Sequence, residues 1–200
     1  MKKLIVLMLL FCITACVPDW VVKGDSMGWG LAKIWQSITS LWIENDGIIG
    51  ACIEQFLPEK RQIPKGVIFG GINNEGWFWN IPVKYSIKDY QTYHTNLKKH
   101  VKKVICVTVP HVIKYAGTDV SESFLNDIKK LNAAITKKCG PEYTVQSWDI
   151  PFTHVGDGEH PDDQMNKKIL EKILEIDAAT DLMNTDTESE SMESETTETE

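Results

Sequence analysis

The chain has 200 residues, 42% of them hydrophobic and seven of them Trp, which is enough for one domain with a substantial core. Its formal net charge is −7, but residues 185–200 hold seven acidic residues and no basic one, so the rest of the chain is formally neutral. A neutral domain without a basic patch argues against a nucleic-acid partner.

The N-terminal residues have the pattern of a bacterial export signal. Two lysines precede an apolar run, Leu4–Ile13, which is too short for the roughly 20 residues that a membrane-spanning helix needs. The run ends in Ile13-Thr14-Ala15-Cys16, which resembles a lipobox, the site where the signal is cut and the Cys is acylated. We therefore predict a lipoprotein signal peptide over residues 1–15. An ordinary secretory signal with a chance Cys is the alternative.

Acylation of Cys16 with a diacylglycerol and an amide-linked chain such as palmitate would attach the domain to a membrane. Residues 16–19 would then form a short tether to the first strand. Val17, not Asp, follows the Cys, so we expect the outer membrane if the source is a bacterium with two membranes.

Segments between residues 20 and 184 alternate between strand-like and helix-like patterns. Short apolar runs predict five strands: Trp20–Lys23, Leu41–Glu44, Gly66–Phe69, Val104–Val109 and Tyr143–Trp148. Helical patterns occupy Leu31–Ser40, Ile49–Leu57, Ile87 to Val101, Ser121–Cys139 and Asp162–Leu182. This alternation predicts an α/β fold with three layers, in which helices cover both faces of a parallel sheet.

The C-terminal residues 185–200 consist almost entirely of Glu, Ser, Thr and Asp, with one apolar residue. Such a segment cannot bury enough apolar surface to offset the entropy lost on ordering. We predict a disordered acidic tail that begins after residue 184.

Three of the five cysteines, Cys52, Cys106 and Cys139, remain after the signal and the acylated Cys16 are set aside. Three cysteines form at most one disulfide, and their spacing does not suggest a zinc site. Because Cys106 lies in an apolar strand, we predict a buried thiol there.

Ligands of parallel sheets bind beyond the carboxyl ends of the strands. Polar residues that follow the predicted strands are therefore candidates for chemistry. They are Asp25-Ser26, Asn45-Asp46-Gly47, Gly70-Gly71-Ile72-Asn73, His111 and the loop Thr153–His160.

These strand-end residues include the groups that acyl transfer requires, namely a nucleophile, a base, an anion that orients the base and donors for the oxyanion. Ser26 lies where a strand turns into a helix, so its hydroxyl and its N–H can both face the cleft. His160 follows the last strand, and Asp157 precedes it by three residues. Gly50 offers a backbone N–H, and Asn73 offers a side-chain amide.

Four motifs in this order resemble the conserved blocks of the SGNH, or GDSL-type, hydrolases. They are Gly24-Asp25-Ser26, Gly47-Ile48-Ile49-Gly50, Gly71-Ile72-Asn73-Asn74 and Asp157-Gly158-Glu159-His160-Pro161. Each motif alone is weak, but four in order, over roughly residues 20–180, are a strong joint signal. The resemblance implies a flavodoxin-like five-stranded sheet and an ester hydrolase that uses no metal or organic cofactor.

The resemblance also implies roles for single residues. Ser26 would be the nucleophile, His160 its base and Asp157 the orienting acid, with Gly50 and Asn73 in the oxyanion hole. Gly47 competes with Gly50 for the oxyanion role.

The chain departs from the family pattern at two places beside these residues. Asn74 replaces the usual Asp, which predicts altered support without loss of activity. Met27-Gly28-Trp29 follows the nucleophile in place of Leu-Ser, which predicts a different pocket wall.

Other residues near the motifs have alternative roles. His154 is a second candidate for the base, and His111 follows a strand and is a candidate for the substrate cleft. His94 lies on the inward face of a helix, so we expect a packing role. Trp77 and Trp79 lie in an aromatic loop that either clamps a substrate or covers the edge of the core.

The predicted function is hydrolysis of a carboxylic ester in the cell envelope. A short-acyl or O-acetyl ester of a glycan or a lipid is the favoured substrate, because no long apolar lid segment is visible. Two alternatives use the same fold: a catalytically silent lipoprotein that binds a glycan or a partner, and an acyltransferase that uses the same triad.

Overall fold

The structure is a computed structural model that describes residues 17–75 and 82–194, with residues 75 and 183–194 described in backbone only. Several predictions fall outside the described residues. These are the signal peptide, the acylation of Cys16, the aromatic loop with Trp77 and Trp79, and the state of residues 195–200.

A five-stranded parallel sheet forms the centre of the domain. Its spatial order is β2-β1-β3-β4-β7, which is the doubly wound, flavodoxin-like order. The strands are β1 (Trp20–Gly24), β2 (Ile43–Gly47), β3 (Ile63–Phe69), β4 (Val101–Val107) and β7 (Thr144–Val145). All four strand pairs are parallel. The predicted α/β class and sheet are confirmed.

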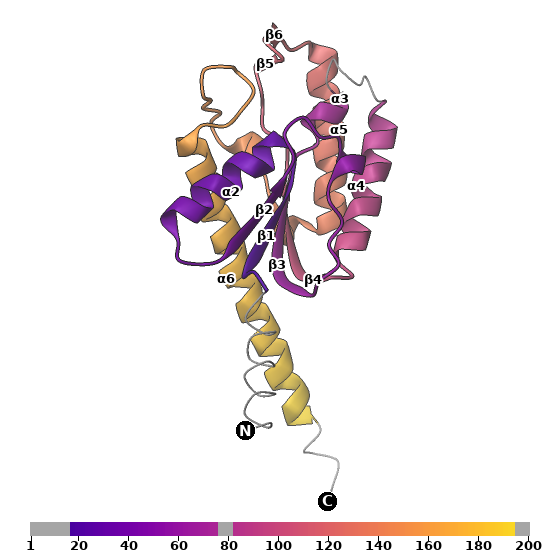
Figure 1. Ribbon diagram of the computed structural model, residues 1–200. Helices are drawn as coiled ribbons and strands as arrows, with labels where there is room; N and C mark the ends of the chain where they lie inside the picture. Colours follow the sequence, from indigo (N-terminus) through magenta and orange to yellow (C-terminus); the bar gives the residue numbers. More distant parts are fainter. Residues whose placement is uncertain (1–16, 76–81, 195–200) are drawn as a thin grey trace, which may run out of the picture.

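Helices cover both faces of the sheet and complete the three layers (Figure 1). Helices α2 (Ser26–Ile38) and α6 (Asp163–Ser194) pack against each other on one face. Helices α3 (Ile72–Glu75), α4 (Val83–Leu97) and α5 (Glu122–Cys139) pack together on the other. Ser121 caps α5 through its side chain, as its position before the helical pattern predicts.

The central strand β1 is buried along its whole length. Its one charged residue, Lys23, is 1% exposed and forms ion pairs with Asp46 of β2 and with Glu59, whose carboxylate lies 3.2 Å away. A buried ammonium group requires such partners because desolvation penalises an unpaired charge. The pairs allow a lysine to occupy the middle of the core.

The structure corrects the bounds of several predicted elements. The predicted helix over Ile49–Leu57 is only a short 3₁₀ turn, Ile53–Gln55, because the side chains of Asn74 and Gln55 accept from the backbone there. The predicted fifth strand pairs only over Thr144–Val145 and is flanked by 3₁₀ turns at Pro141–Tyr143 and Ser147–Asp149.

A small hairpin that the sequence pattern did not predict follows β4. It consists of β5 (Lys114–Tyr115) and β6 (Thr118–Asp119), which pair antiparallel. The backbone N–H groups of Ile113 and Lys114 both donate to the carbonyl of Gly158. These bonds attach the hairpin to the loop that carries Asp157 and His160.

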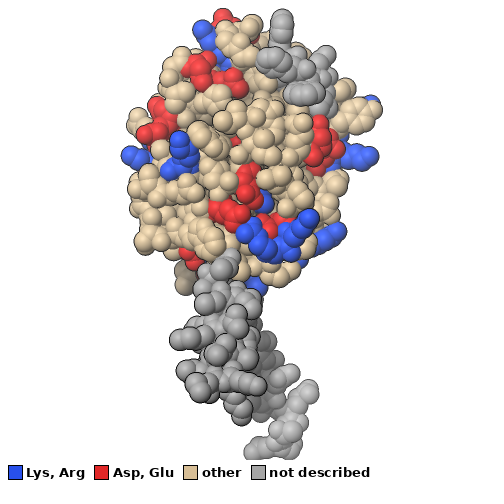
Figure 2. All heavy atoms as spheres, viewed as in Figure 1, with Lys and Arg blue, Asp and Glu red and all other residues tan. Residues whose placement is uncertain are grey.

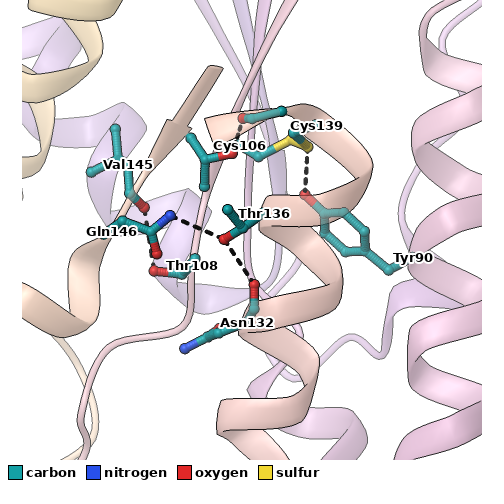
Figure 3. The surroundings of a disulfide bond; sticks show 10 residues. Tyr90, Cys106, Thr108, Asn132, Thr136, Cys139, Val145 and Gln146 are labelled. Atoms are coloured by element: carbon teal, nitrogen blue, oxygen red, sulfur yellow. Dashed lines mark hydrogen bonds between the residues drawn. A yellow bond between two sulfur atoms is a disulfide. The ribbon is translucent and has the colours of Figure 1, made fainter. Parts of the chain in front are cut away.

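A disulfide joins Cys106 of β4 to Cys139 at the end of α5, so the prediction of a buried thiol at Cys106 was wrong (Figure 3). The two residues are 33 positions apart in sequence, and only the packing of α5 against β4 brings their side chains together. The Tyr90 hydroxyl of α4 points at the Cys139 sulfur, 3.7 Å away. Cys52 is the free cysteine of the described residues.

Helix α6 begins near the carboxyl ends of the strands and runs beyond their amino ends (Figure 1). Lys65 and Lys103, on β3 and β4, form ion pairs with Asp177 and Asp181 of the helix. The helix continues to Ser194, beyond the predicted boundary at residue 184. No Gly or Pro interrupts this segment, and Glu is a good helix former.

The surface has a mixed charge on the face that Figure 2 shows, where acidic and basic side chains lie interspersed. Within the described ranges, no helix is both long and apolar enough to cross a bilayer.

Candidate active site

The sheet order places a crevice at the carboxyl ends of β1 and β3. The chain leaves β1 toward one edge of the sheet and leaves β3 toward the other, and such switch points are where doubly wound sheets bind ligands. Ser26 is the first residue of α2, and only the helix N-cap Asp25 separates it from the end of β1. Asn73 lies in α3, just after β3. The topology therefore brings two predicted site residues to one place.

Three predicted residues form a continuous hydrogen-bonded chain. The Nε2 atom of His160 lies 2.8 Å from the Oγ atom of Ser26. The Nδ1 atom of the same ring lies 2.6 Å from an Asp157 carboxylate oxygen. Both distances are hydrogen-bond distances, so the ring connects the hydroxyl to the carboxylate in one line. This is the geometry of a nucleophile, a base and an orienting acid.

The backbone of its own loop also holds the Asp157 carboxylate. Its second oxygen accepts from the N–H groups of Glu159 and His160, each at 2.9 Å. Partial burial raises the pKa of Asp157, but these two bonds and the contact with the His160 ring outweigh it and hold the pKa below its usual value. The group is therefore a carboxylate at neutral pH, as an orienting anion must be.

His154 shapes the same loop and does not contact Ser26. Its Nδ1 atom accepts from the N–H groups of Gly156 and Gly158, at 3.0 and 3.1 Å, and its ring stacks on Phe152. The alternative assignment of His154 as the base thus lacks the required contact.

The other two histidines with alternative roles lie away from Ser26. His111 packs against the Trp148 ring. Two surface cavities are lined by Ser26, and His111 lines neither of them. His94 is 4% exposed in α4, and burial and two nearby lysines lower its pKa to about 4. It is a neutral packing residue at physiological pH, as expected.

Gly50 is suited to supply an oxyanion donor. A 3.1 Å hydrogen bond from the Ala51 N–H to the Ile48 carbonyl closes a β-turn. Gly50 occupies the third position of this turn with φ of +78°, and a positive φ there favours Gly. Gly50 faces the same hollow as Ser26 and Asn73. In the described part of the chain, no hydrogen bond uses the N–H of Gly50.

Gly47 has a different role, which is close packing. Its N–H already donates to the Asn45 side chain at 3.1 Å. A Cβ atom at Gly47 would lie 2.4 Å from the backbone nitrogen of Trp29 in α2. Gly47 thus lets α2 approach β2, and the geometry favours Gly50 over Gly47 as the oxyanion glycine.

Asn73 is held by two partners that orient its amide. Its Nδ2 donates to the Ala51 carbonyl at 3.1 Å, and its Oδ1 accepts from the Tyr115 hydroxyl at 2.9 Å. Burial and the negative charge of Glu159 raise the Tyr115 pKa to about 12, so the hydroxyl remains a donor. The second N–H of the amide is left for a ligand. Tyr115 lies in the unpredicted hairpin, so sequence reasoning missed it.

Asn74, where the family usually has Asp, supports the loop that carries Gly50. It is fully buried, and its Oδ1 accepts from the Ile53 N–H at 2.8 Å. Asn74 therefore has a structural position, and the altered support expected from its amide stays a prediction.

Asp25 is the main residue of the site whose role sequence reasoning missed. It is fully buried, and its two oxygens accept from Met27 at the start of α2 and from Gly71 after β3, at 2.9 and 2.8 Å. Burial raises its pKa to about 6, and those two bonds offset the effect only in part. Its place before Ser26 as a helix N-cap was the available signal.

Two hollows meet at Ser26 and His160, which line both. The smaller, about 310 Å³, also contains Gly50, Asn73, Tyr115 and Glu159. The larger, about 590 Å³, runs beside α2 and is mostly apolar. A ligand bound at Ser26 therefore has both hollows available.

One group of side chains among the described residues has the spacing of a metal site, namely His94 with Cys106 and Cys139. Both sulfurs are engaged in the disulfide, and a metal requires free thiolates. The cluster is therefore not a metal site while the disulfide is intact.

Known structures share this fold. A GDSL-like lipase from Bacteroides thetaiotaomicron superimposes with a TM-score of 0.61 and 16% identity over 80% of this chain and 87% of that one. A lipase/acylhydrolase from Enterococcus faecalis does so with a TM-score of 0.55 and 15% identity over 82% and 97%. No family model matches the sequence, and no curated protein sequence matches it.

The neighbours establish that the chain has the fold of GDSL-like hydrolases, as its motifs predict. The OSK domain of Drosophila Oskar is also similar, with a TM-score of 0.55 and 12% identity over 78% of this chain and 87% of that one. Because one fold serves several functions, activity must be argued from the site.

The ionisation of Asp25 predicts a pH dependence of stability. An acid whose folded-state pKa, about 6, exceeds its ordinary value of 3.8 keeps its proton longer in the folded state. Stability from this group therefore falls as pH rises from 4 to 6, by up to about 3 kcal/mol. Asp25→Asn removes this titration. We expect the wild-type minus variant difference in unfolding free energy, measured by urea denaturation, to decrease over this range.

Asp157→Asn is the control of opposite sign, because the pKa of Asp157 is lowered. Its contribution is lost only as pH falls below 4, so its difference should not decline between pH 4 and 7. A wild-type minus Asp25→Asn difference that is constant or rises with pH would contradict the assignment.

Proposed function

We propose that the protein is a serine esterase that hydrolyses a carboxylic ester. The observation that carries the proposal is the line of contacts from the Ser26 hydroxyl through the His160 ring to the Asp157 carboxylate. The fold, shared with GDSL-like lipases and acylhydrolases, is consistent with it.

In the first step, Nε2 of His160 takes the Ser26 proton while Oγ attacks the ester carbonyl. A bond from Oγ to the carbonyl carbon forms, and the carbonyl electrons move to its oxygen. The imidazolium is stabilised by Asp157 and then gives its proton to the departing alcohol as the carbon–oxygen bond breaks. The acyl group is left on Ser26.

The negative oxygen of the intermediate would be held by three donors. They are the N–H groups of Ser26 and Gly50 and the side-chain amide of Asn73. Gly50, Asn73 and Ser26 border one hollow, and donors fixed before reaction stabilise developing charge without reorganisation.

Water then attacks the acyl group by the same route in reverse, and the acid is released. The His160 side chain is 34% exposed, so water reaches the base without a conformational change. This accessibility favours hydrolysis over the alternative acyltransferase, in which an alcohol replaces water. The contact from His160 to Ser26 also argues against a catalytically silent binding protein.

We further propose that the protein is exported and anchored through an acylated Cys16. The disulfide between Cys106 and Cys139 supports export, because disulfides persist in oxidising compartments. Ser26 lies at the end of β1 opposite to the entry of the chain at Val17, roughly 15 Å along the strand. The site would face away from an anchoring membrane, toward esters of the envelope.

Removing each group of the triad tests the proposal directly. Ser26→Ala and His160→Ala should lower kcat for p-nitrophenyl acetate on the order of a thousandfold or more, and Asp157→Asn by a similar factor. Ser40→Ala and His111→Ala are matched controls, because both residues lie away from the triad, and they should retain activity. Equal rates in wild type and Ser26→Ala, after subtraction of spontaneous hydrolysis, would exclude the esterase.

Tyr115→Phe tests whether the hairpin positions the oxyanion amide. Loss of its hydrogen bond to Asn73 should lower kcat about tenfold with little change in KM, whereas Asn73→Ala should cost about a hundredfold. In the Asn73→Ala background, Tyr115→Phe should have almost no further effect, since the two act through one group. Additive losses would mean that Tyr115 acts elsewhere.

The anchor is tested by growing cells that express the full chain with labelled palmitate. The wild-type protein should carry the label, and Cys16→Ser should not. Label that persists in Cys16→Ser, or is absent from the wild type, would argue against acylation at this residue.

A further inference from the structure

The larger hollow beside Ser26 is a groove along one face of helix α2. Ser26, Gly30, Ile34 and Ser37 line it at the three- and four-residue spacing of a single helix face. From Ser26 to Ser37 this face is about 16 Å long. The start of α6 and the loop before it form the opposite wall. The groove therefore leads away from the nucleophile as a continuous channel.

The lining of the groove is mostly apolar, with Asp163 and Asn166 as polar residues at the start of α6. Met27 and Ile34 contribute from α2, and Ile49, Val155 and Pro161 contribute from loops. Ile49 and Val155 are 67% and 65% exposed, which is unusual for large aliphatic side chains. They come from loops far apart in the sequence but border the same groove. An apolar occupant would cover both.

Farther along α2 the lining becomes more polar. Lys33 and Ser37 line this part, and the Lys33 ammonium group lies 4.4 Å from the centre of the Trp29 ring. Along the helix axis Lys33 lies about 10 Å from Ser26, and Ile34, the last apolar residue of α2 in the groove, lies about 12 Å from it. An apolar chain of medium length fits the distance over which the wall is apolar.

The smaller hollow shares Ile49 with the groove, but it also contains the two proposed oxyanion donors and a carboxylate. Gly50 and Asn73, the proposed oxyanion donors, line it, so the carbonyl oxygen of an ester would point there. Glu159 also lines it, with one oxygen accepting from the Ala116 N–H at 3.0 Å and the other 4.0 Å from His160 Nε2. A carboxylate beside the base is a partner for hydroxyl groups and repels anions. This side suits a hydroxylated alcohol, close to the nitrogen that protonates it.

We propose that the groove along α2 binds the acyl chain of the substrate, which makes the substrate a medium-chain acyl ester of a hydroxylated alcohol such as a sugar or glycerol. The inference rests on the esterase function proposed above. It replaces the acetyl or short acyl group favoured by the sequence with a longer one. Whatever fills the groove is joined to the carbonyl that Ser26 attacks, because Ser26 forms its end.

Gly30→Leu closes the groove without touching the triad. A Cβ atom at Gly30 has one neighbour within 4 Å, the Asn166 side-chain nitrogen at 3.8 Å, so it meets no clash. Gly30→Ala is the matched control, since it restores a helix-forming residue but leaves the groove open. Both variants of the full chain are compared with wild type by thermal unfolding and by hydrolysis of p-nitrophenyl acetate, butyrate, octanoate and palmitate.

In wild type and Gly30→Ala, we expect kcat/KM to rise about fourfold per buried methylene up to octanoate, and to fall for palmitate. Gly30→Leu should lose at least tenfold on octanoate and stay within about twofold on acetate. Acetate hydrolysis that needs Ser26, with no gain from acetate to octanoate or no effect of Gly30→Leu, overturns the groove alone. No Ser26-dependent hydrolysis of any ester overturns the esterase itself.

Two isomeric esters decide which half of the substrate occupies the groove. Methyl octanoate and heptyl acetate have the same formula, but the long chain lies on the acyl side in the first and on the alcohol side in the second. Titration of released acid should show that wild type prefers methyl octanoate and that Gly30→Leu removes the preference. If heptyl acetate is preferred and Gly30→Leu affects it instead, the groove binds the alcohol and the proposal is wrong.

Discussion

The carboxylate of Asp25 is the interaction on which the site depends. It begins helix α2 by accepting from Met27, and it joins that helix to the end of β3 by accepting from Gly71. Ser26 and Asn73 follow these two strand ends, so one buried group sets the distance between nucleophile and oxyanion donor. The raised pKa of Asp25, about 6, reflects the cost of placing a charge where only two donors reach it.

The other two residues of the proposed triad come from a more exposed loop. Asp157 and His160 lie on a loop whose shape comes from its own backbone bonds and from the ring of His154. The β5–β6 hairpin then connects this loop to Asn73 through Tyr115. Buried hydrogen bonds therefore hold the proposed oxyanion donor Asn73, whereas the proposed base His160 is 34% exposed to water.

The same arrangement places the two hollows on either side of Ser26. The carboxyl ends of β1 and β3 and the hairpin enclose polar groups on one side of Ser26, and α2 extends an apolar wall on the other. Both hollows lie at the carboxyl ends of the strands, whereas the described chain enters the sheet at their amino ends, at Val17. The disulfide between β4 and α5 stabilises the packing of this helix on the sheet. It is also consistent with an oxidising compartment.

The sequence by itself determined the parallel sheet, the order of the motifs and the three residues of the proposed triad. Alternating patterns are local, and parallel strand ends converge whatever the side chains between them, so Ser26 and the Asp157–His160 loop were predictable. Only the tertiary structure favoured Gly50 over Gly47 as the proposed oxyanion glycine. It also revealed the bonds of Asp25 to Gly71 and of Tyr115 to Asn73, and it paired Cys106 with Cys139. Each of these depends on contacts between residues more than 15 positions apart, and such distances follow from how helices pack on the sheet, which no local pattern encodes.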